Sequence, residues 1–239
     1  MRELRTSAIA SDSQLFSAPD AQHAATMNCD RVARVYQTLE YLSFGGTLQS
    51  CRVMYLDEAA GCRRALLCGD GDGRFLAALL SANREVRVDF VDLSAGMVDV
   101  ARRRAAAAGS HALARVRFQV GNVRRFEPDD VTYDLITAHF FLDCFGENGV
   151  RSVASRLASL AGSRTKLLLS DFRIPQRGIS RYIDAAIVRG LYGAFRLTTG
   201  LRVTRLPDYE GALAQAGFRK QRETLKLGGL LAASLWQRA

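Results

Sequence analysis

Glycine and aspartate alternate over residues 69–73, in the stretch "LLCGDGDGRF" that begins with a short apolar run. Glycine permits positive φ angles and lets a ligand approach the backbone closely. In an open parallel sheet, ligands bind beyond the carboxyl ends of the strands, where a strand turns into its helix. The apolar run followed by Gly69, Gly71 and Gly73 therefore predicts a ligand-binding turn.

The spacing and the charge of this loop restrict its ligand. The dinucleotide-binding fingerprint is G-x-G-x-x-G, whereas the glycines here follow G-x-G-x-G. Asp70 and Asp72 would also repel a pyrophosphate group at the N-terminus of the following helix. A ligand that bears cations suits the loop better than a dinucleotide does.

The elements around the loop alternate between strand-like and helical patterns, as in an α/β fold. Short apolar runs predict strands at residues 64–68, 86–92, 116–120, 133–138 and 166–171. Three- and four-residue apolar spacing predicts helices at residues 21–44, 49–59, 74–83, 95–108, 149–161 and 207–216. The last residues form two strands around Gly228-Gly229. We therefore expect a Rossmann-like, seven-stranded, mostly parallel sheet with helices on both faces, a C-terminal antiparallel hairpin and an N-terminal helical cap.

Two further stretches add to the glycine loop. The second expected strand ends in "VDFVDLSAGMVDVAR", and "VGNVRRF" follows the third. With the loop, they make residues 64–238 resemble the class I S-adenosylmethionine-dependent methyltransferases. The helical segment "NCDRVARVYQTLEYLSFGG" is similar, more loosely, to the small-molecule branch that includes ubiquinone and menaquinone C-methyltransferase-like proteins.

The resemblance implies S-adenosylmethionine as the cofactor and assigns its contacts. Asp92 matches the acid that binds the ribose hydroxyls, and a carboxylate suits a vicinal diol because it accepts two hydrogen bonds. Asn122 replaces the acid that meets the adenine amino group, and Val123 offers a backbone N–H. The family usually has an acid where Leu67 stands, so either Asp70 or backbone carbonyls hold the ammonium group. The expected cofactor-binding residues are Gly69, Asp70, Gly71, Gly73, Asp92, Leu93, Met97, Asn122, Val123 and His139.

Three residues are candidates for catalysis. Methyl transfer from a sulfonium needs positioning, a dry pocket and, where the acceptor carries a proton, a base. "DLITAHFFLDCF" places His139 and Asp143 after the fourth strand, where such a base belongs. The alternatives are that His139 packs beside the cofactor or makes a structural hydrogen bond, and that Asp143 caps the helix that follows. Tyr36 on the first helix is either a contact to the cofactor or acceptor, or a half-buried aromatic.

The chain divides into three expected parts: a loose arm over residues 1–20, a helical cap over residues 21–60 and the methyltransferase domain over residues 61–239. Residues 173–206 form a long insertion, and connections of this length usually carry function. Apolar residues recur there at helical spacing, at Ile183, Ile187, Leu191, Tyr192 and Phe195. Arginines are concentrated in the same segment, at Arg173, Arg177, Arg181, Arg189, Arg196, Arg202 and Arg205.

The arginines of this insertion indicate the chemical type of the acceptor. Because arginine binds carboxylate and phosphate in a bidentate way, we expect an acceptor with an aromatic or apolar body and an anionic group, or one tethered to an acidic carrier protein. The alternative is that these arginines are ordinary surface charge in an arginine-rich chain.

The composition of the chain restricts the class of protein to which it can belong. The chain has 239 residues, is 48% hydrophobic and 24% charged, and has no apolar stretch near the length of a membrane span. With no secretory signal, we expect a soluble cytoplasmic protein. The five cysteines are scattered without a CxxC pair, so we expect no metal site. The net charge of +9 suits an RNA methyltransferase, but the Asn/Asp-Pro-Pro-aromatic motif is missing. A non-methylating S-adenosylmethionine-binding protein or a cyclase is a further alternative.

Overall fold

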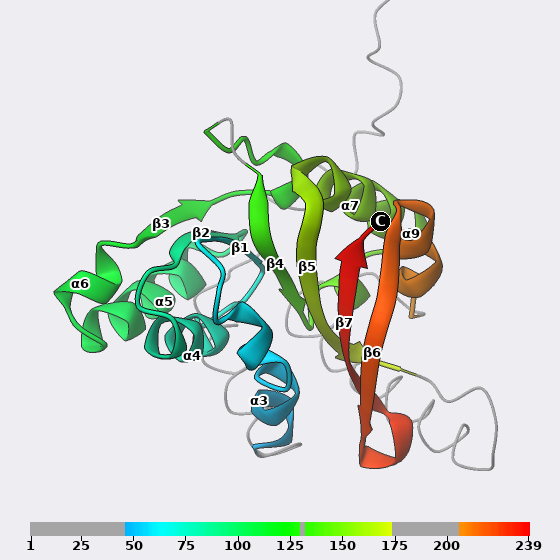
Figure 1. Ribbon diagram of the computed structural model, residues 1–239, viewed down its shortest axis with the longest axis horizontal. Coiled ribbons are helices and arrows are strands. Elements are labelled where there is room, and N and C mark those ends of the chain that lie inside the picture. Colours follow the sequence, from blue (N-terminus) through cyan, green and yellow to red (C-terminus); the bar gives the residue numbers. More distant parts are fainter. Residues whose placement is uncertain (1–45, 130–131, 174–205) are drawn as a thin grey trace, which may run out of the picture.

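The computed structural model describes residues 46–129, 132–173 and 206–239, and Figure 1 draws these as ribbons. A seven-stranded sheet runs through them in the order β3-β2-β1-β4-β5-β7-β6. Strands β1 to β5 pair in parallel, whereas β7 is antiparallel to both of its neighbours, β5 and β6. The strands are β1 (Arg64–Cys68), β2 (Arg87–Asp92), β3 (Val116–Val120), β4 (Tyr133–His139), β5 (Ala161–Phe172), β6 (Phe218–Lys226) and β7 (Leu231–Arg238).

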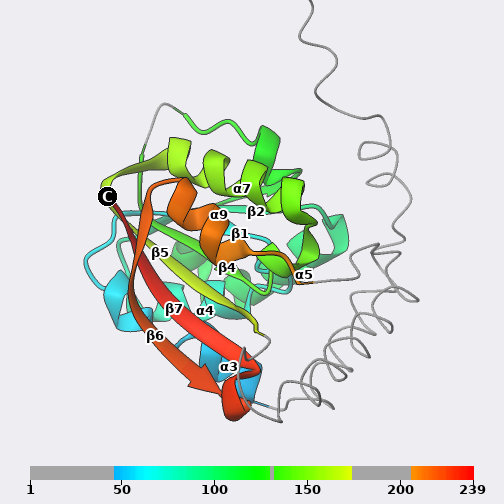
Figure 2. The same cartoon turned by 90° about the vertical axis from the view of Figure 1, so that its right-hand side faces the viewer.

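Helices cover both faces of the sheet, as Figure 2 shows. On one face lie α3 (Thr47–Arg52), α4 (Arg74–Ala82) and α5 (Ala95–Ala107), and on the other lie α7 (Glu147–Leu160) and α9 (Tyr209–Gln215). The remaining helical segments are α6 (Ser110–Leu113), η1 (Leu56–Ala59), η2 (Val123–Arg125), η3 (Leu142–Cys144) and η4 (Leu227–Gly229).

Strand β1 shows why its short apolar run forms a central strand. Successive side chains of a strand point to opposite faces. Ala65 and Leu67 pack into the core on the α4 side, and Leu66 and Cys68 pack into the core on the α7 side. All four are fully buried. A strand covered on both faces needs a continuous apolar run rather than an alternating one.

The structure confirms the expected fold, with differences at two elements. The helix expected over residues 49–59 is divided into α3 and η1, because Tyr55 turns inward and its hydroxyl lies 2.9 Å from Thr224 Oγ1 of β6. Strand β5 begins at Ala161 rather than at residue 166, since Ala161 pairs with Tyr133 across an irregular register. The expected helix over residues 21–44 and most of the insertion over residues 173–206 lie outside the described residues.

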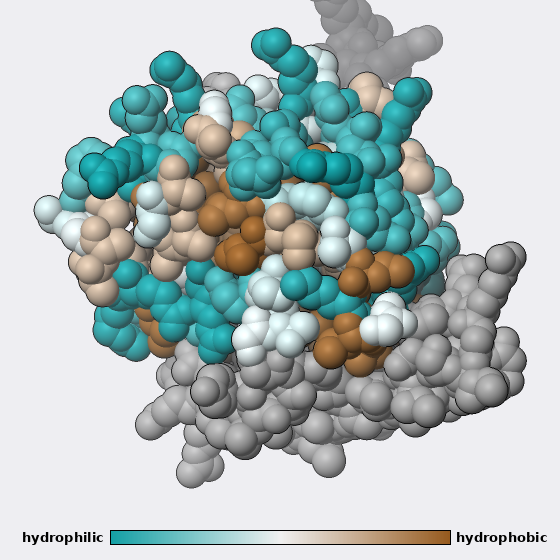
Figure 3. Space-filling view, turned by 60° about the horizontal axis from the view of Figure 1, so that its bottom comes forward, coloured by the Kyte–Doolittle hydropathy of each residue, from teal (hydrophilic) through white to brown (hydrophobic). Residues whose placement is uncertain are grey.

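The surface drawn in Figure 3 has apolar side chains in patches separated by polar ones. Large exposed apolar residues of the described ranges are Leu93, Val120, Leu225 and Leu227. No helix within these ranges has the length and apolar character needed to span a membrane.

Candidate functional site

The glycine loop joins β1 to α4 at the carboxyl edge of the sheet. Gly69, Gly71 and Gly73 have φ values of +62°, +60° and +76°. The N–H of Gly69 donates to the carbonyl of Val91 at 2.9 Å, which ties the loop to β2. A Cβ on Gly69 would clash with the ring of Phe141, so the absence of a side chain lets the loop pack against the segment that follows β4. The expected turn is present, and its glycines are required by conformation and by packing.

Asp92 ends β2 and points back at this loop. Its Oδ2 accepts a hydrogen bond from the N–H of Gly71 at 3.1 Å, and its Oδ1 accepts one from the N–H of Ser94 at 2.9 Å. Burial raises the pKa of Asp92, and these two N–H groups lower it. A carboxylate offers about four lone-pair positions, so two remain for hydroxyl donors.

Apolar surface flanks Asp92. Leu93 follows it and is 51% exposed, and Val120, which pairs with Asp92 across the sheet, is 52% exposed. Two large apolar side chains open to solvent beside a carboxylate suit the flat ring and the ribose of a nucleoside. Sequence reasoning missed Val120, because an apolar residue that ends a strand carries no signal of exposure.

Other expected cofactor contacts have local structural partners. Asn122 Oδ1 accepts from the N–H of Arg124 at 3.0 Å and caps η2, while Val123 is buried. The N–H of Met97 donates to Ser94 Oγ at 3.2 Å at the start of α5. Met97 Sδ is the nearest atom to the position of a Cβ on Gly71, at 4.0 Å. Met97 therefore borders the open side of the loop.

The two aspartates of the loop have different environments. Asp72 pairs with Arg74 at 3.0 Å and with Arg104 at 3.2 Å. Its charge is therefore compensated by two arginines, which reduces the repulsion that Asp72 alone would exert on a pyrophosphate. Asp70 turns inward, and its Oδ2 accepts from the N–H of Leu76 at 3.0 Å.

Asp70 keeps one carboxylate oxygen unused. Its Oδ1 is buried and has no hydrogen-bond partner among the described residues. Burial raises the pKa of Asp70 to about 7, while the N–H of Leu76 and the positive charge of Arg52 act in the opposite direction. An unpartnered buried oxygen is costly unless a donor reaches it. Asp70 can therefore hold a cationic group beside the loop.

His139 ends β4 in a buried position. Its Nδ1 lies 3.1 Å from Ser170 Oγ, and Ser170 Oγ donates to the carbonyl of Cys51 at 3.0 Å. Because the single hydroxyl proton of Ser170 is used there, Nδ1 carries the imidazole proton and Nε2 is the bare acceptor. Burial lowers the pKa of His139 to about 3, with Arg52 acting in the same direction. The ring is therefore neutral at ordinary pH, with a buried Nε2 that has no described partner.

The backbone after His139 is strained. Phe140 has a φ of +52°, which is rare for a residue with a side chain, and its N–H donates to the carbonyl of Ser170 at 2.6 Å. Strain of this kind costs about 1–3 kcal/mol and collects at functional sites. The turn brings Phe141 against Gly69 and leads into η3, which carries Asp143.

Asp143 forms a buried carboxyl pair with Asp171 at the end of β5. The N–H of Asp143 donates to Asp171 Oδ2 at 3.2 Å, and a hydrogen bond joins the two side chains. Burial, and next the negative charge of Asp143, raises the pKa of Asp171 well above its ordinary value. Two buried carboxyl groups in contact share one proton, because both cannot ionise together. The pair therefore carries one proton, and the raised pKa of Asp171 favours its location on Asp171.

Sequence reasoning found Asp143 but missed Asp171. Asp171 lies within the expected strand over residues 166–171, and no spacing links it to Asp143. Tyr36 lies outside the described residues, and so do the apolar residues of the insertion and its arginines after Arg173. Their expected roles stay predictions. Arg173, the first arginine of the insertion, lies 3.5 Å from a carboxylate oxygen of Glu223. Among residues 46–129, 132–173 and 206–239, no three His, Cys, Asp or Glu side chains form a metal-binding group.

Comparison with known proteins agrees with this geometry. Residues 66–167 match the family model described as a methyltransferase domain. The match runs from β1 into β5 and so contains the glycine loop, Asp92, His139 and Asp143. A comparison with curated protein sequences gives no match.

Solved structures show the same fold. An O-methyltransferase family protein from Burkholderia thailandensis is 19% identical, with a TM-score of 0.69, and the match covers 92% of this chain and 62% of that one. Mitomycin 7-O-methyltransferase is 18% identical, with a TM-score of 0.65 and coverages of 92% and 60%. An O-methyltransferase from neocarzinostatin biosynthesis, in complex with S-adenosylmethionine and 2-hydroxy-5-methyl naphthoic acid, is 18% identical, with a TM-score of 0.60 and coverages of 87% and 57%. The chain thus spans less than two thirds of the length of each of these proteins.

Proposed function

We propose that this chain is a class I S-adenosylmethionine-dependent methyltransferase that methylates a hydroxyl oxygen of a small organic molecule. The match of residues 66–167 and the O-methyltransferase neighbours support this proposal. They do not favour an RNA methyltransferase, a cyclase or a non-methylating protein, and the ubiquinone and menaquinone C-methyltransferase-like subtype is not confirmed.

The residues at the carboxyl edge of the sheet fit the cofactor. The unpartnered Oδ1 of Asp70 suits the ammonium group, and Asp92 has lone pairs left for the ribose hydroxyls. Leu93 and Val120 offer exposed apolar surface for the adenine ring. When bound, S-adenosylmethionine supplies an electrophilic methyl group attached to a sulfonium. The single observation that carries the proposal is this set of a cation acceptor, a diol acceptor and an apolar surface around one glycine loop.

Asp143 is the proposed proton acceptor for the hydroxyl group. A hydroxyl oxygen attacks a methyl group better when a base takes its proton, and this contributes typically 10²- to 10⁴-fold. The burial that lowers the pKa of His139 makes its imidazole a weak base. Asp143 is held as a carboxylate by the protonated Asp171 beside it. His139 then acts as a positioning residue that links β4 through Ser170 to α3.

The proposed acceptor is a hydroxylated aromatic acid. A neighbour with this fold is crystallised with 1,4-dihydroxy-2-naphthoic acid, and the arginine-rich insertion gives the same expectation of an aromatic body with an anionic group. We expect the protein to produce S-adenosylhomocysteine with a higher kcat/KM for this acid than for its neutral methyl ester. Added salt should reduce the difference, because an exposed charge pair is screened. Equal rates for the acid and the ester would contradict the anionic acceptor, and no product from any phenol would contradict O-methylation.

The proposed contact of Asp70 with the ammonium group predicts a pH dependence of binding. The pKa of Asp70 is raised to about 7 in the folded protein, compared with about 4 in the unfolded chain. The contribution of Asp70 to folding stability is therefore complete below about pH 4, and it is lost as the pH rises through about 7. S-adenosylhomocysteine carries an ammonium group and should bind the ionised form. We therefore expect its affinity to rise, and proton release on binding to fall, as pH is raised through 7.

Calorimetry in two buffers of different ionisation enthalpy measures both quantities. Asp70→Asn should bind more weakly at high pH and lose the pH dependence. Methylthioadenosine, which lacks the amino-acid group, is the matched ligand and should show little pH dependence with either protein. An unchanged pH profile in Asp70→Asn would place the ammonium group elsewhere.

A further inference from the structure

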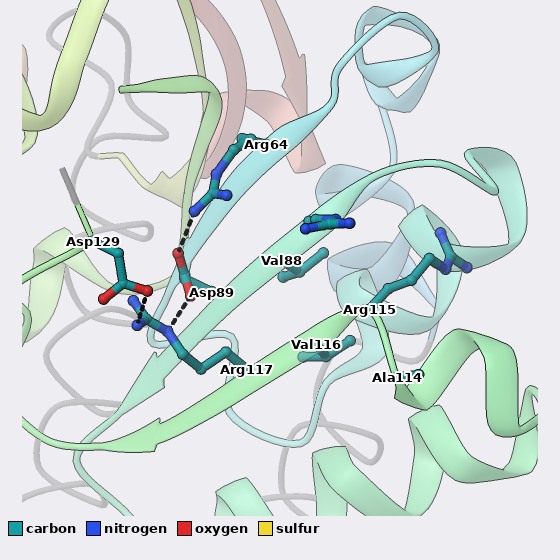
Figure 4. A pocket seen from close by; sticks show the side chains of 9 residues that line it. Arg64, Val88, Asp89, Ala114, Arg115, Val116, Arg117 and Asp129 are labelled. Carbon is teal, nitrogen blue, oxygen red and sulfur yellow. Dashed lines mark hydrogen bonds and ion pairs between the residues drawn. The ribbon is translucent and has the colours of Figure 1, made fainter. Parts of the chain in front are cut away.

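A pocket lies at the opposite edge of the sheet from the glycine loop, where β1, β2 and β3 begin. In Figure 4, Arg64 of β1, Asp89 of β2 and Arg117 of β3 point toward one another. The volume of the pocket is about 430 Å³, within the range of small-molecule sites. We call it the arginine pocket, lined by Arg64, Arg87, Val88, Asp89, Ala114, Arg115, Val116, Arg117 and Asp129. Four arginines face two aspartates there, so the pocket carries a net positive charge.

Asp89 offsets part of this charge from a buried position. It is 6% exposed, and Arg117 Nε donates to its Oδ1 at 2.6 Å. Tyr133 donates its hydroxyl to Asp89 Oδ2 at 2.6 Å, and Arg64 lies 3.9 Å from the same oxygen. Because both oxygens are engaged, Asp89 fixes the guanidinium of Arg117 in place.

Arg115 has a structural role instead. Its guanidinium donates to the carbonyls of Leu80, Asn83 and Val86, close to the end of α4. It adds charge to the pocket wall without being free to move. Arg87 is exposed, and its guanidinium makes no hydrogen bond or ion pair with the described part of the chain.

Asp129 occupies the position of an anionic ligand. Its Oδ2 lies 2.8 Å from Arg117 Nη1, while its side chain is 79% exposed (Figure 4). An ion pair this exposed is worth at most about 1 kcal/mol. A stronger anion can therefore displace Asp129 at little cost.

We propose that the arginine pocket binds a small phosphate-bearing molecule, whose phosphate displaces Asp129 from Arg117 and is held also by Arg87 and Arg64. Guanidinium groups bind phosphate through paired, charge-assisted hydrogen bonds, which are roughly twice as strong as neutral ones. The pocket lies apart from the carboxyl edge of the sheet, so its ligand is distinct from the cofactor and the acceptor. This proposal does not depend on the proposed methyl transfer.

Titration calorimetry with inorganic pyrophosphate tests it, using full-length protein saturated with S-adenosylhomocysteine so that the cofactor site is filled. We expect saturable binding that Arg87→Gln weakens by at least about tenfold, the effect of one charge-assisted contact. Asp129→Asn should tighten binding several-fold, because it removes the competing carboxylate. Inorganic phosphate should bind more weakly than pyrophosphate at the same residues.

Two matched variants control for general electrostatics. Arg103→Gln and Asp99→Asn make the same charge changes at exposed positions of α5, outside the pocket. Both should leave the affinity for pyrophosphate within about twofold of that of the original protein, because salt screens exposed charges that do not contact the ligand. Absence of pyrophosphate binding would overturn the proposal, as would equal effects of Arg87→Gln and Arg103→Gln, or weaker binding by Asp129→Asn.

Discussion

Asp143→Asn is expected to lower kcat for methyl transfer by about 10²- to 10⁴-fold, the usual contribution of a general base. The affinity for S-adenosylhomocysteine should stay unchanged, because Asp143 lies in η3 and is not among the expected cofactor contacts. Asparagine has nearly the same shape as aspartate, and the N–H of residue 143 can still donate to Asp171. Single-turnover rates with an active phenolic acceptor measure the chemical step directly. A rate close to that of the original protein would exclude Asp143 as the proton acceptor.

Substitutions at Asp171 separate its positioning role from a merely structural one. Asp171→Asn keeps a donor beside Asp143, because the amide N–H replaces the carboxylic acid O–H. We expect the kcat of Asp171→Asn to stay within about tenfold of that of the original protein, well above the kcat of Asp143→Asn. Asp171→Ala removes the donor, which raises the pKa of Asp143 and moves the acid limb of the pH profile of kcat to higher pH. If Asp171→Asn were as inactive as Asp143→Asn, the pair would not work as proposed.

His139→Ala tests whether His139 is a base or a positioning residue. If it were the base, His139→Ala would lower the rate by about 10²- to 10⁴-fold with cofactor affinity intact. As a positioning residue, it should instead lose thermal stability along with activity, because Ser170 loses its donor and Phe75 loses a ring neighbour at 4.6 Å. The rate and the unfolding temperature together distinguish the two roles.

Asp92→Ala should weaken the binding of S-adenosylhomocysteine by about 1–3 kcal/mol, or about 5- to 150-fold. The change removes the expected acceptor for the ribose hydroxyls. It also leaves the N–H groups of Gly71 and Ser94 without their carboxylate partner. Calorimetry at fixed pH measures the loss.

Two further variants serve as controls for Asp92→Ala. Asp92→Asn keeps one acceptor oxygen and should fall between the original protein and Asp92→Ala. Asp99→Asn removes a carboxylate from the exposed surface of α5 and should have no effect. Equal affinity of Asp92→Ala and the original protein would contradict the assignment of S-adenosylmethionine to this loop.

The sequence by itself determined the local features of this protein. The apolar run before Gly69 is read along the chain, and so is the change from strand to helix at Gly73. Asp92 was predicted from the resemblance of "VDFVDLSAGMVDVAR" to the methyltransferase family, and its place at the end of a strand is also read along the chain. These features depend on spacing and on backbone conformation, which neighbouring residues largely fix.

Only the tertiary structure decided which side chains are in contact and which charges are compensated by a neighbouring group. Asp70 and Asp72 are two residues apart, yet one is buried with a free oxygen and the other pairs with Arg74 and Arg104. Asp143 and Asp171 lie on different elements, and their contact arises because β4 and β5 are neighbours in the sheet. The pKa of a carboxyl group depends on its burial and on charges within a few ångströms. Those neighbours come from distant parts of the chain, so spacing along the sequence does not reveal them.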